Sequence, residues 1–179
     1  MVKERGLNAT YERMSVGDVD NPDVSTIMAY WEALRGGRLA PPWAAFDWSE
    51  IPTHCIQNVT VVDVSPDPFD FIYRFWGTNL AQGQKQEMTG YSVRALKPRE
   101  EGVSIFNQFA EVCEARKPIV FRSSVKGWMQ VDLVGIALRM PFSDDGKDVS
   151  HIVSCVDFQQ AYSVLELSLD DPWSRVDTD

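Results

Sequence analysis

The sequence predicts an α+β fold whose strands form an antiparallel sheet. Apolar residues recur with a helical spacing near the start of the chain, and after residue 57 the spacing changes to two. Strand-like runs follow one another through short turns, and helical segments cluster between two groups of them. Sequential hairpins need no crossover helix, so antiparallel pairing is expected. The 179 residues, 44% of them hydrophobic, suffice for one domain with a sizeable core.

The first element expected is a helix over residues 22–35, which follows a weakly ordered lead-in over 1–21. A capping asparagine, a proline and an acid at residues 21–23 are typical of a helix start, and a glycine pair follows its end. One apolar stripe runs along this helix at Val24, Ile27, Met28, Trp31 and Leu34. The helix and an ordered connector, which holds two tryptophans that need somewhere to pack, make up residues 22–57.

The sheet is expected within a core over residues 58–158. Its strands are predicted at 58–64, 69–77, 119–126, 130–142 and 149–158. Between the second and third strands, residues 78–98 are broken by two glycines and predict short helical pieces. Residues 100–116 carry one apolar stripe and predict a longer helix. Residues 159–179 carry five acids against one base and predict an acidic C-terminal tail.

Several short motifs, which are weak singly and specific in their shared order, resemble those of a bacterial PAS family of small, often free-standing proteins. These motifs are Tyr30–Arg38, Val62–Val64, Tyr73–Phe75, Thr89–Tyr91, Lys117-Pro118 and Arg139–Phe142. The resemblance covers about residues 25–158. It implies a PAS-like five-stranded antiparallel sheet with helices across one face, plus an N-terminal flanking helix. Parallel strands, or helices on both faces, would contradict the interpretation that follows from it.

What the resemblance implies about function is a sensory or regulatory module of bacterial signal transduction. PAS domains bind small ligands or cofactors between sheet and helices, or use the outer face of the sheet to dimerise. The ligand and any cofactor are unknown. No kinase, cyclase or DNA-binding module follows residue 158, so a signalling protein partner is expected to carry the output. A homodimer is also expected, because Trp31 and its helix offer an apolar surface that needs a cover.

Alternating residues of the strand over 69–77 share a face, and its aromatic set is expected to face a pocket or core together with aromatics of the helix over 100–116. Arginines on strands are candidates for holding an anionic ligand. The candidate ligand-binding residues are therefore Phe71, Tyr73, Phe75, Phe106, Phe109, Phe121, Arg74 and Arg122. Two alternatives stay open: the aromatics simply fill the interior, and the arginines, with Arg139, pair with acids on the solvated face.

No enzyme is predicted, and no catalytic or metal-binding residue is proposed. The sequence lacks a nucleophile elbow, a phosphate-cradling glycine loop and the ligand pattern of a calcium loop at residues 144–148. Flavin photochemistry lacks its cysteine motif, and haem lacks a histidine on the longer helix; His151 is read as an ordinary half-buried strand residue. A ligand-free adaptor, and less so a small enzyme that uses the cavity, remain the alternative functions.

Charge and hydropathy bound the partners. The net charge is −9 with no cluster of lysine and arginine, which excludes nucleic acid as the expected partner. The N-terminus lacks the apolar core of a signal peptide, and no apolar run is long enough to cross a bilayer. The protein is therefore expected in the cytoplasm, without membrane contact and with its three cysteines reduced.

Overall fold

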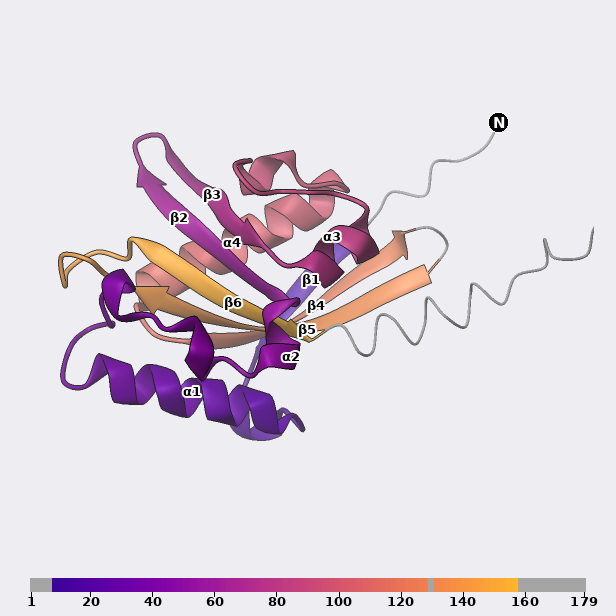
Figure 1. Cartoon of the computed structure of the whole chain (residues 1–179). Coiled ribbons are helices and arrows are strands. Elements are labelled where there is room, and N and C mark those ends of the chain that lie inside the picture. The colour runs from indigo at the N-terminus through magenta and orange to yellow at the C-terminus, as the bar shows by residue number, and fades with distance from the viewer. Residues whose placement is uncertain (1–7, 129–130, 158–179) are drawn as a thin grey trace, which may run out of the picture.

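The computed structural model of the protein describes residues 8–128 and 131–157 (Figure 1). Its strands form one six-stranded sheet in the order β1-β4-β5-β6-β2-β3, and every neighbouring pair is antiparallel. The strands are β1 Asn8–Met14, β2 Val59–Pro66, β3 Phe69–Trp76, β4 Ile119–Trp128, β5 Val131–Phe142 and β6 His151–Asp157. The α+β class and the antiparallel sheet are thus confirmed.

The helices occupy the intervals between these strands. They are α1 Pro22–Arg35, α2 Thr53–Ile56, α3 Thr78–Gln84 and α4 Arg99–Ala115. Short 3-10 turns are η1 Val16–Asp18, η2 Trp43–Ala45, η3 Trp48–Glu50 and η4 Val93–Ala95. The Asn21 side chain accepts a hydrogen bond from the Asp23 N–H and so caps α1, and Gly36, with φ of 56°, ends it.

Strand β1 corrects the sequence analysis, which treated residues 1–21 as a weakly ordered lead-in. It pairs with β4 along its whole length and adds a sixth strand at one border of the sheet. The segment is polar, so no local pattern marked it as a strand. Tertiary contacts supply the reason: Tyr11 packs edge-on against Phe121, and its hydroxyl donates to Glu111 Oε1 on α4 over 2.6 Å. Residues 1–7 and the tail expected from 159 lie outside the described residues.

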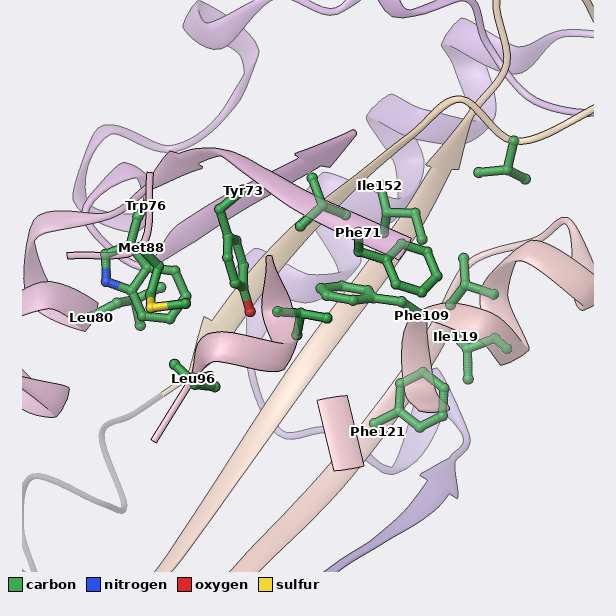
Figure 2. Packing of buried hydrophobic residues seen from close by; sticks show 14 residues of the cluster. Phe71, Tyr73, Trp76, Leu80, Met88, Leu96, Phe109, Ile119, Phe121 and Ile152 are labelled. Atoms are coloured by element: carbon green, nitrogen blue, oxygen red, sulfur yellow. The ribbon is translucent and has the colours of Figure 1, made fainter. Parts of the chain in front are cut away.

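Two hydrophobic cores lie on opposite faces of the sheet. The first is covered by α3, η4 and α4, and Figure 2 shows its aromatic and aliphatic side chains. The second is covered by α1 and the connector before β2, as the position of α1 opposite α4 in Figure 1 shows. Helices therefore lie on both faces, so the expectation that they cover one face is wrong: α1, which was expected only to flank the core, covers the second face. This arrangement meets the condition that was to contradict the sensory interpretation. All the helices between β3 and β4 nevertheless share one face, and the second face is covered by the segment that precedes β2.

Trp31 is the main anchor of α1 on the second face. Its side chain is 1% exposed, and its Nε1–H donates to the carbonyl of Pro141 on β5 over 2.8 Å. The apolar surface that was expected to need a second subunit is therefore covered by the chain's own sheet. The argument from Trp31 to a homodimer is withdrawn.

A bulge in the β2–β3 hairpin changes which side chains of β3 face the first core. Val61 lies opposite Phe75 while Val62 lies opposite Tyr73, so Arg74 is an extra residue on β3. Beyond it the alternation reverses, and Trp76 turns into the first core while Phe75 packs on the second. The expectation that Phe75 shares a face with Phe71 and Tyr73 is wrong for this reason.

Candidate functional site

A buried arginine lies in the first core, among the aromatic side chains. Arg139 stands on β5 opposite Ser154 of β6, and it is 4% exposed. Its Nη1 donates to Ser154 Oγ over 2.9 Å, and its Nε and Nη2 both donate to Gln108 Oε1, over 3.0 and 2.9 Å. The guanidinium also lies 4.4 Å from the ring centroid of Phe109. All these partners are neutral.

Gln108, which receives the guanidinium, is itself held from both sides. It projects from α4 and is fully buried. Its Nε2 donates to Ser123 Oγ on β4 over 2.9 Å and to Ser104 Oγ, one helical turn earlier, over 3.3 Å. The amide is thus oriented with its carbonyl toward Arg139. Helix, two strands and the arginine form one polar network inside an otherwise apolar layer.

The charge balance of this network is unusual. Burial lowers the pKa of Arg139 to about 10, so the guanidinium is still charged at neutral pH. Among the described residues, no carboxylate forms an ion pair with it. Glu101, at the start of α4, is close enough for its charge to favour the charged guanidinium, but burial raises the pKa of Glu101 to about 7. A buried cation faces an acid that is half ionised at neutral pH.

Glu101 is linked to a second polar residue of the covering helices. Gln84, the last residue of α3, donates from its Nε2 to Glu101 Oε1 over 2.9 Å. The Oε1 of Gln84 is buried and accepts no hydrogen bond from any described residue. A buried acceptor without a donor costs free energy, and a donor group on a bound molecule would relieve that cost.

Five of the predicted aromatics lie in the same core as the arginine, and Phe109 contacts it. Phe71, Tyr73, Phe109 and Phe121 are buried in the first core, and Phe106 packs at its rim. Phe71 lies 5.1 Å from the centroids of both Phe106 and Phe109. Figure 2 shows Phe71, Phe109 and Phe121 gathered between β3, α4 and β4, with Trp76, Leu80 and Met88 at the other end of the layer. Burial also raises the pKa of the Tyr73 hydroxyl. Five of the eight candidate residues therefore meet in one place.

The other three candidates lie elsewhere. Phe75 contacts Trp48 on the second face, at 4.9 Å between ring centroids. Arg74 is exposed and pairs with Asp63 over 2.6 Å. This agrees with the alternative that the arginines pair with acids on the solvated face. Arg122 is also exposed, 3.9 Å from Glu12, and it lines a shallow cleft of about 270 Å³ beside η1. Neither arginine faces the first core.

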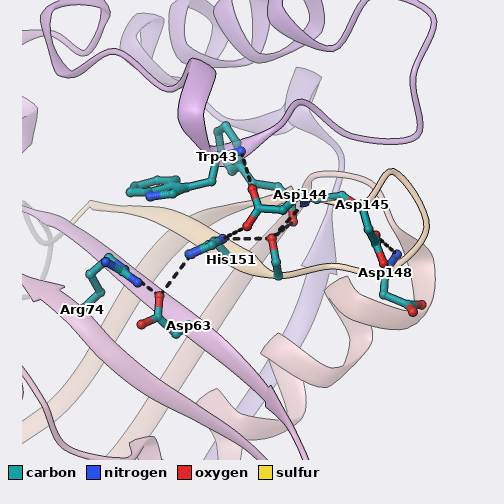
Figure 3. A network of polar contacts seen from close by, with 10 residues as sticks. Trp43, Asp63, Arg74, Asp144, Asp145, Asp148 and His151 are labelled. Atoms are coloured by element: carbon teal, nitrogen blue, oxygen red, sulfur yellow. Dashed lines mark hydrogen bonds and ion pairs between the residues drawn. The ribbon is translucent and has the colours of Figure 1, made fainter.

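A second polar cluster surrounds His151 at the start of β6 (Figure 3). The imidazole stacks on Trp43 with 4.9 Å between ring centroids. Its Nε2 lies 3.3 Å from Asp63 Oδ1, and its Nδ1 lies 2.9 Å from Ser150 Oγ and 3.5 Å from Asp144 Oδ2. Burial lowers the pKa of His151, and the two acids oppose that change.

The serine of this cluster also has backbone partners. Ser150 Oγ accepts the N–H of Asp144 over 3.1 Å and lies 3.4 Å from the carbonyl of Phe142. The backbone N–H of Trp43 donates to Asp144 Oδ1 over 3.2 Å. These contacts fasten the connector to the turn between β5 and β6. They fit the expectation of a structural strand histidine.

The polar half of the first-core site was missed at the sequence level. Arg139 was considered as an arginine that could hold an anionic ligand, but pairing with an acid on the solvated face was preferred and it was left out of the candidate residues. Gln108 and Glu101 were not considered as a site. One signal was available: Arg139 interrupts an apolar run in the predicted strand over 130–142, which the structure places in the interior of the sheet. Such strands are buried on both faces, so a charge within one has no solvated face to reach.

Comparison with known proteins gives no relative. No family model, no curated protein and no solved structure matches this chain. In the part of the chain that the structure describes, no helix has the length and apolar character to cross a membrane.

Proposed function

We propose that the chain is a PAS-like sensory or regulatory module of bacterial signal transduction, which binds a small anionic ligand between the sheet and α4. Strands β2 to β6 stand in the sheet order β3-β2-β6-β5-β4, and all helices between β3 and β4 cover one face. This arrangement supports a PAS-like core, to which β1 and α1 are additions. A signalling protein partner and cytoplasmic localisation belong to the same proposal.

The observation that carries the proposal is the Arg139 guanidinium. Burying a charge without a counter-ion is costly, and such charges in proteins are normally paired. Two of its donors share a single amide oxygen of Gln108. A carboxylate or phosphate would offer two charged oxygens to the same fork, which makes shorter and stronger hydrogen bonds. An anionic ligand would therefore replace Gln108 as the acceptor.

This exchange of acceptors would couple ligand binding to the position of α4 on the sheet. If Gln108 loses Arg139, its carbonyl needs another donor, and the position of α4 over the sheet changes with it. Glu101 stands about two turns earlier in the same helix and would compete with the ligand for the cation. A ligand shifts such an element only by its differential affinity for two arrangements, commonly about 1–3 kcal/mol.

The alternative of a ligand-free adaptor is favoured by the packing. Phe71, Phe109 and Phe121 are fully buried and already occupy the space between sheet and helix. In that case Arg139 serves only to orient α4 on the sheet. A homodimer fits either function, but it must use a surface other than that of Trp31.

The alternative of a small enzyme is favoured by Glu101. A buried acid with a pKa near the working pH suits general acid–base catalysis. A sensor retains the same bound molecule when Glu101 becomes glutamine, whereas an enzyme accumulates unconverted substrate. The bound mass therefore distinguishes these two functions.

The test is native mass spectrometry of freshly purified protein, compared with its denatured mass. The wild type is expected to carry a small anionic molecule, which is lost in Arg139→Met. Methionine keeps much of the arginine stem and removes the charge, so the fold is expected to persist. Arg122→Met, at an exposed arginine of β4, is the matched control and retains the molecule. An Arg139→Met variant that keeps it, or a wild type that carries none, contradicts ligand sensing through Arg139.

A further inference from the structure

Three side chains of different chemistry meet where α1 begins. Asp23 lies in the first turn of α1, and His54 and Cys55 lie on α2. Their ligand atoms all lie within 4.8 Å of one another, and His54 Nε2 stands 2.6 Å from Asp23 Oδ2. Figure 1 shows α2 beside the N-terminal part of α1. A carboxylate, an imidazole and a thiol therefore converge from two segments that are 31 residues apart.

The backbones that carry these groups are fixed locally. Pro22 occupies the first turn of α1, and the Asn21 side chain accepts the N–H of Asp23 over 2.9 Å. On the other side, the carbonyl of Pro52 accepts the N–H of Cys55 over 2.7 Å. Prolines restrict both segments, so little conformational entropy remains to be lost when the three groups bind a common partner.

We propose that Asp23, His54 and Cys55 form a binding site for Zn²⁺. Thiolate, imidazole and carboxylate are the donors that zinc takes, at about 2.3, 2.0 and 2.0 Å, whereas calcium and magnesium require oxygen donors. Tetrahedral ligands at those distances lie roughly 3.3–3.8 Å apart. To reach this geometry, the Asp23–His54 contact must open by about 1 Å from 2.6 Å, and any pair as far apart as 4.8 Å must close by about 1 Å.

The fourth coordination position is open to solvent. The His54 side chain is 68% exposed, so a water molecule reaches the ion from that side. With Asp23, His54 and Cys55 as its ligands, the site has three protein donors and one water.

Bound zinc would fasten the start of α1 to the connector that precedes β2. Both segments cover the second core, where Cys55 and Val24 pack. The metal would add a cross-link at the edge of that layer, and it would stabilise the fold in proportion to its occupancy. The site is independent of Arg139, which lies in the other core.

The test is titration of untagged, chelator-treated protein with Zn²⁺ by isothermal calorimetry. One equivalent is expected to bind and to raise the melting temperature. His54→Ala, at an exposed position that leaves the fold intact, is expected to weaken binding by more than about tenfold and to abolish the thermal shift. Cys55→Ser should do the same, whereas Cys113→Ser, at a thiol against the first core, should bind as the wild type does.

Cobalt substitution adds a reading of the donor set. Co²⁺ in the wild type is expected to show a thiolate charge-transfer band and the intense visible bands of four-coordination, and Cys55→Ser should lose the first. Absence of Zn²⁺ binding at millimolar concentration overturns the proposal. Binding that persists unchanged in His54→Ala overturns it equally.

Discussion

At the scale of single residues, the most consequential group is Glu101. Burial raises its pKa to about 7, from a usual value near 4.5. A carboxyl whose folded pKa is raised stabilises the fold fully below its unfolded pKa, and that contribution is lost as the pH rises through the folded pKa. The window of this loss is therefore about pH 4.5 to 7. At pH 8 the folded protein carries the whole cost of the buried charge.

Glu101→Gln is expected to remove that cost. Its free energy of unfolding should match the wild type at pH 5 and exceed it at pH 8 by up to about 3 kcal/mol. Urea denaturation at the two pH values measures the difference. Glu100→Gln is the matched control, since Glu100 is exposed on the same turn and should change neither value. Identical pH dependence in wild type and Glu101→Gln would contradict the burial argument.

His151 is expected to change the free energy of unfolding with pH in the opposite direction. Its pKa is lowered by burial, so the unfolded chain binds the proton more readily than the fold does. The stability that neutral His151 contributes is present above its unfolded pKa, near 6.5, and is lost as the pH falls from there through the folded pKa.

NMR titration of the imidazole protons is expected to give His151 a pKa below 6.5. The chain has two histidines, so His54→Ala assigns the signals directly. A His151 pKa above 6.5 would mean that Asp63 and Asp144 outweigh burial. In that case the cluster would gain stability on acidification.

At the scale of elements, the approach of α4 to η4 depends on Gly102. A Cβ built on this residue would lie 2.9 Å from the carbonyl oxygen of Val93 and 3.3 Å from that of Leu96. Both obstacles are backbone atoms that cannot rotate away. The glycine therefore permits a close contact at the first turns of the helix that carries Gln108.

Gly102→Ala is expected to lower the free energy of unfolding by about 1–3 kcal/mol, although alanine favours helix intrinsically. Gly37→Ala is the control, because a Cβ there meets nothing within 4 Å. Chemical denaturation of both variants measures the contrast. A Gly102→Ala protein as stable as the wild type would show that η4 yields easily.

The same scale shows what sequence reasoning could reach. Helix α1 begins and ends where its cap, proline and glycines stand, because those signals are local. Strand β1 could not be predicted, since its support comes from Phe121 and Glu111, over 90 residues away. The reversal at Phe75 was equally hidden, because a bulge depends on the register of two strands and not on the composition of one.

At the scale of the whole molecule, the class and the sheet followed from the alternation of hairpins, but the second core did not. The apolar stripe of α1 was read as a surface in search of a partner, whereas it lies on the chain's own sheet through Trp31. An apolar stripe predicts that one side of a helix is buried, but it does not predict whether that side packs on the same chain or on a second subunit. The aromatic residues of the candidate site were predicted, but its charged residues were not. To predict Arg139 as buried, one must know which strand is central in the sheet.

Strand β5 has a consequence for the whole molecule that follows from its place between the cores. Arg139 points into one interior, while its neighbours Leu138 and Met140 point into the other. Successive side chains of the strand point to opposite faces of the sheet, so a shift of its backbone affects both cores. A ligand that displaced the guanidinium would therefore be expected to displace Leu138 and Met140 as well, and these two side chains pack in the same core as α1.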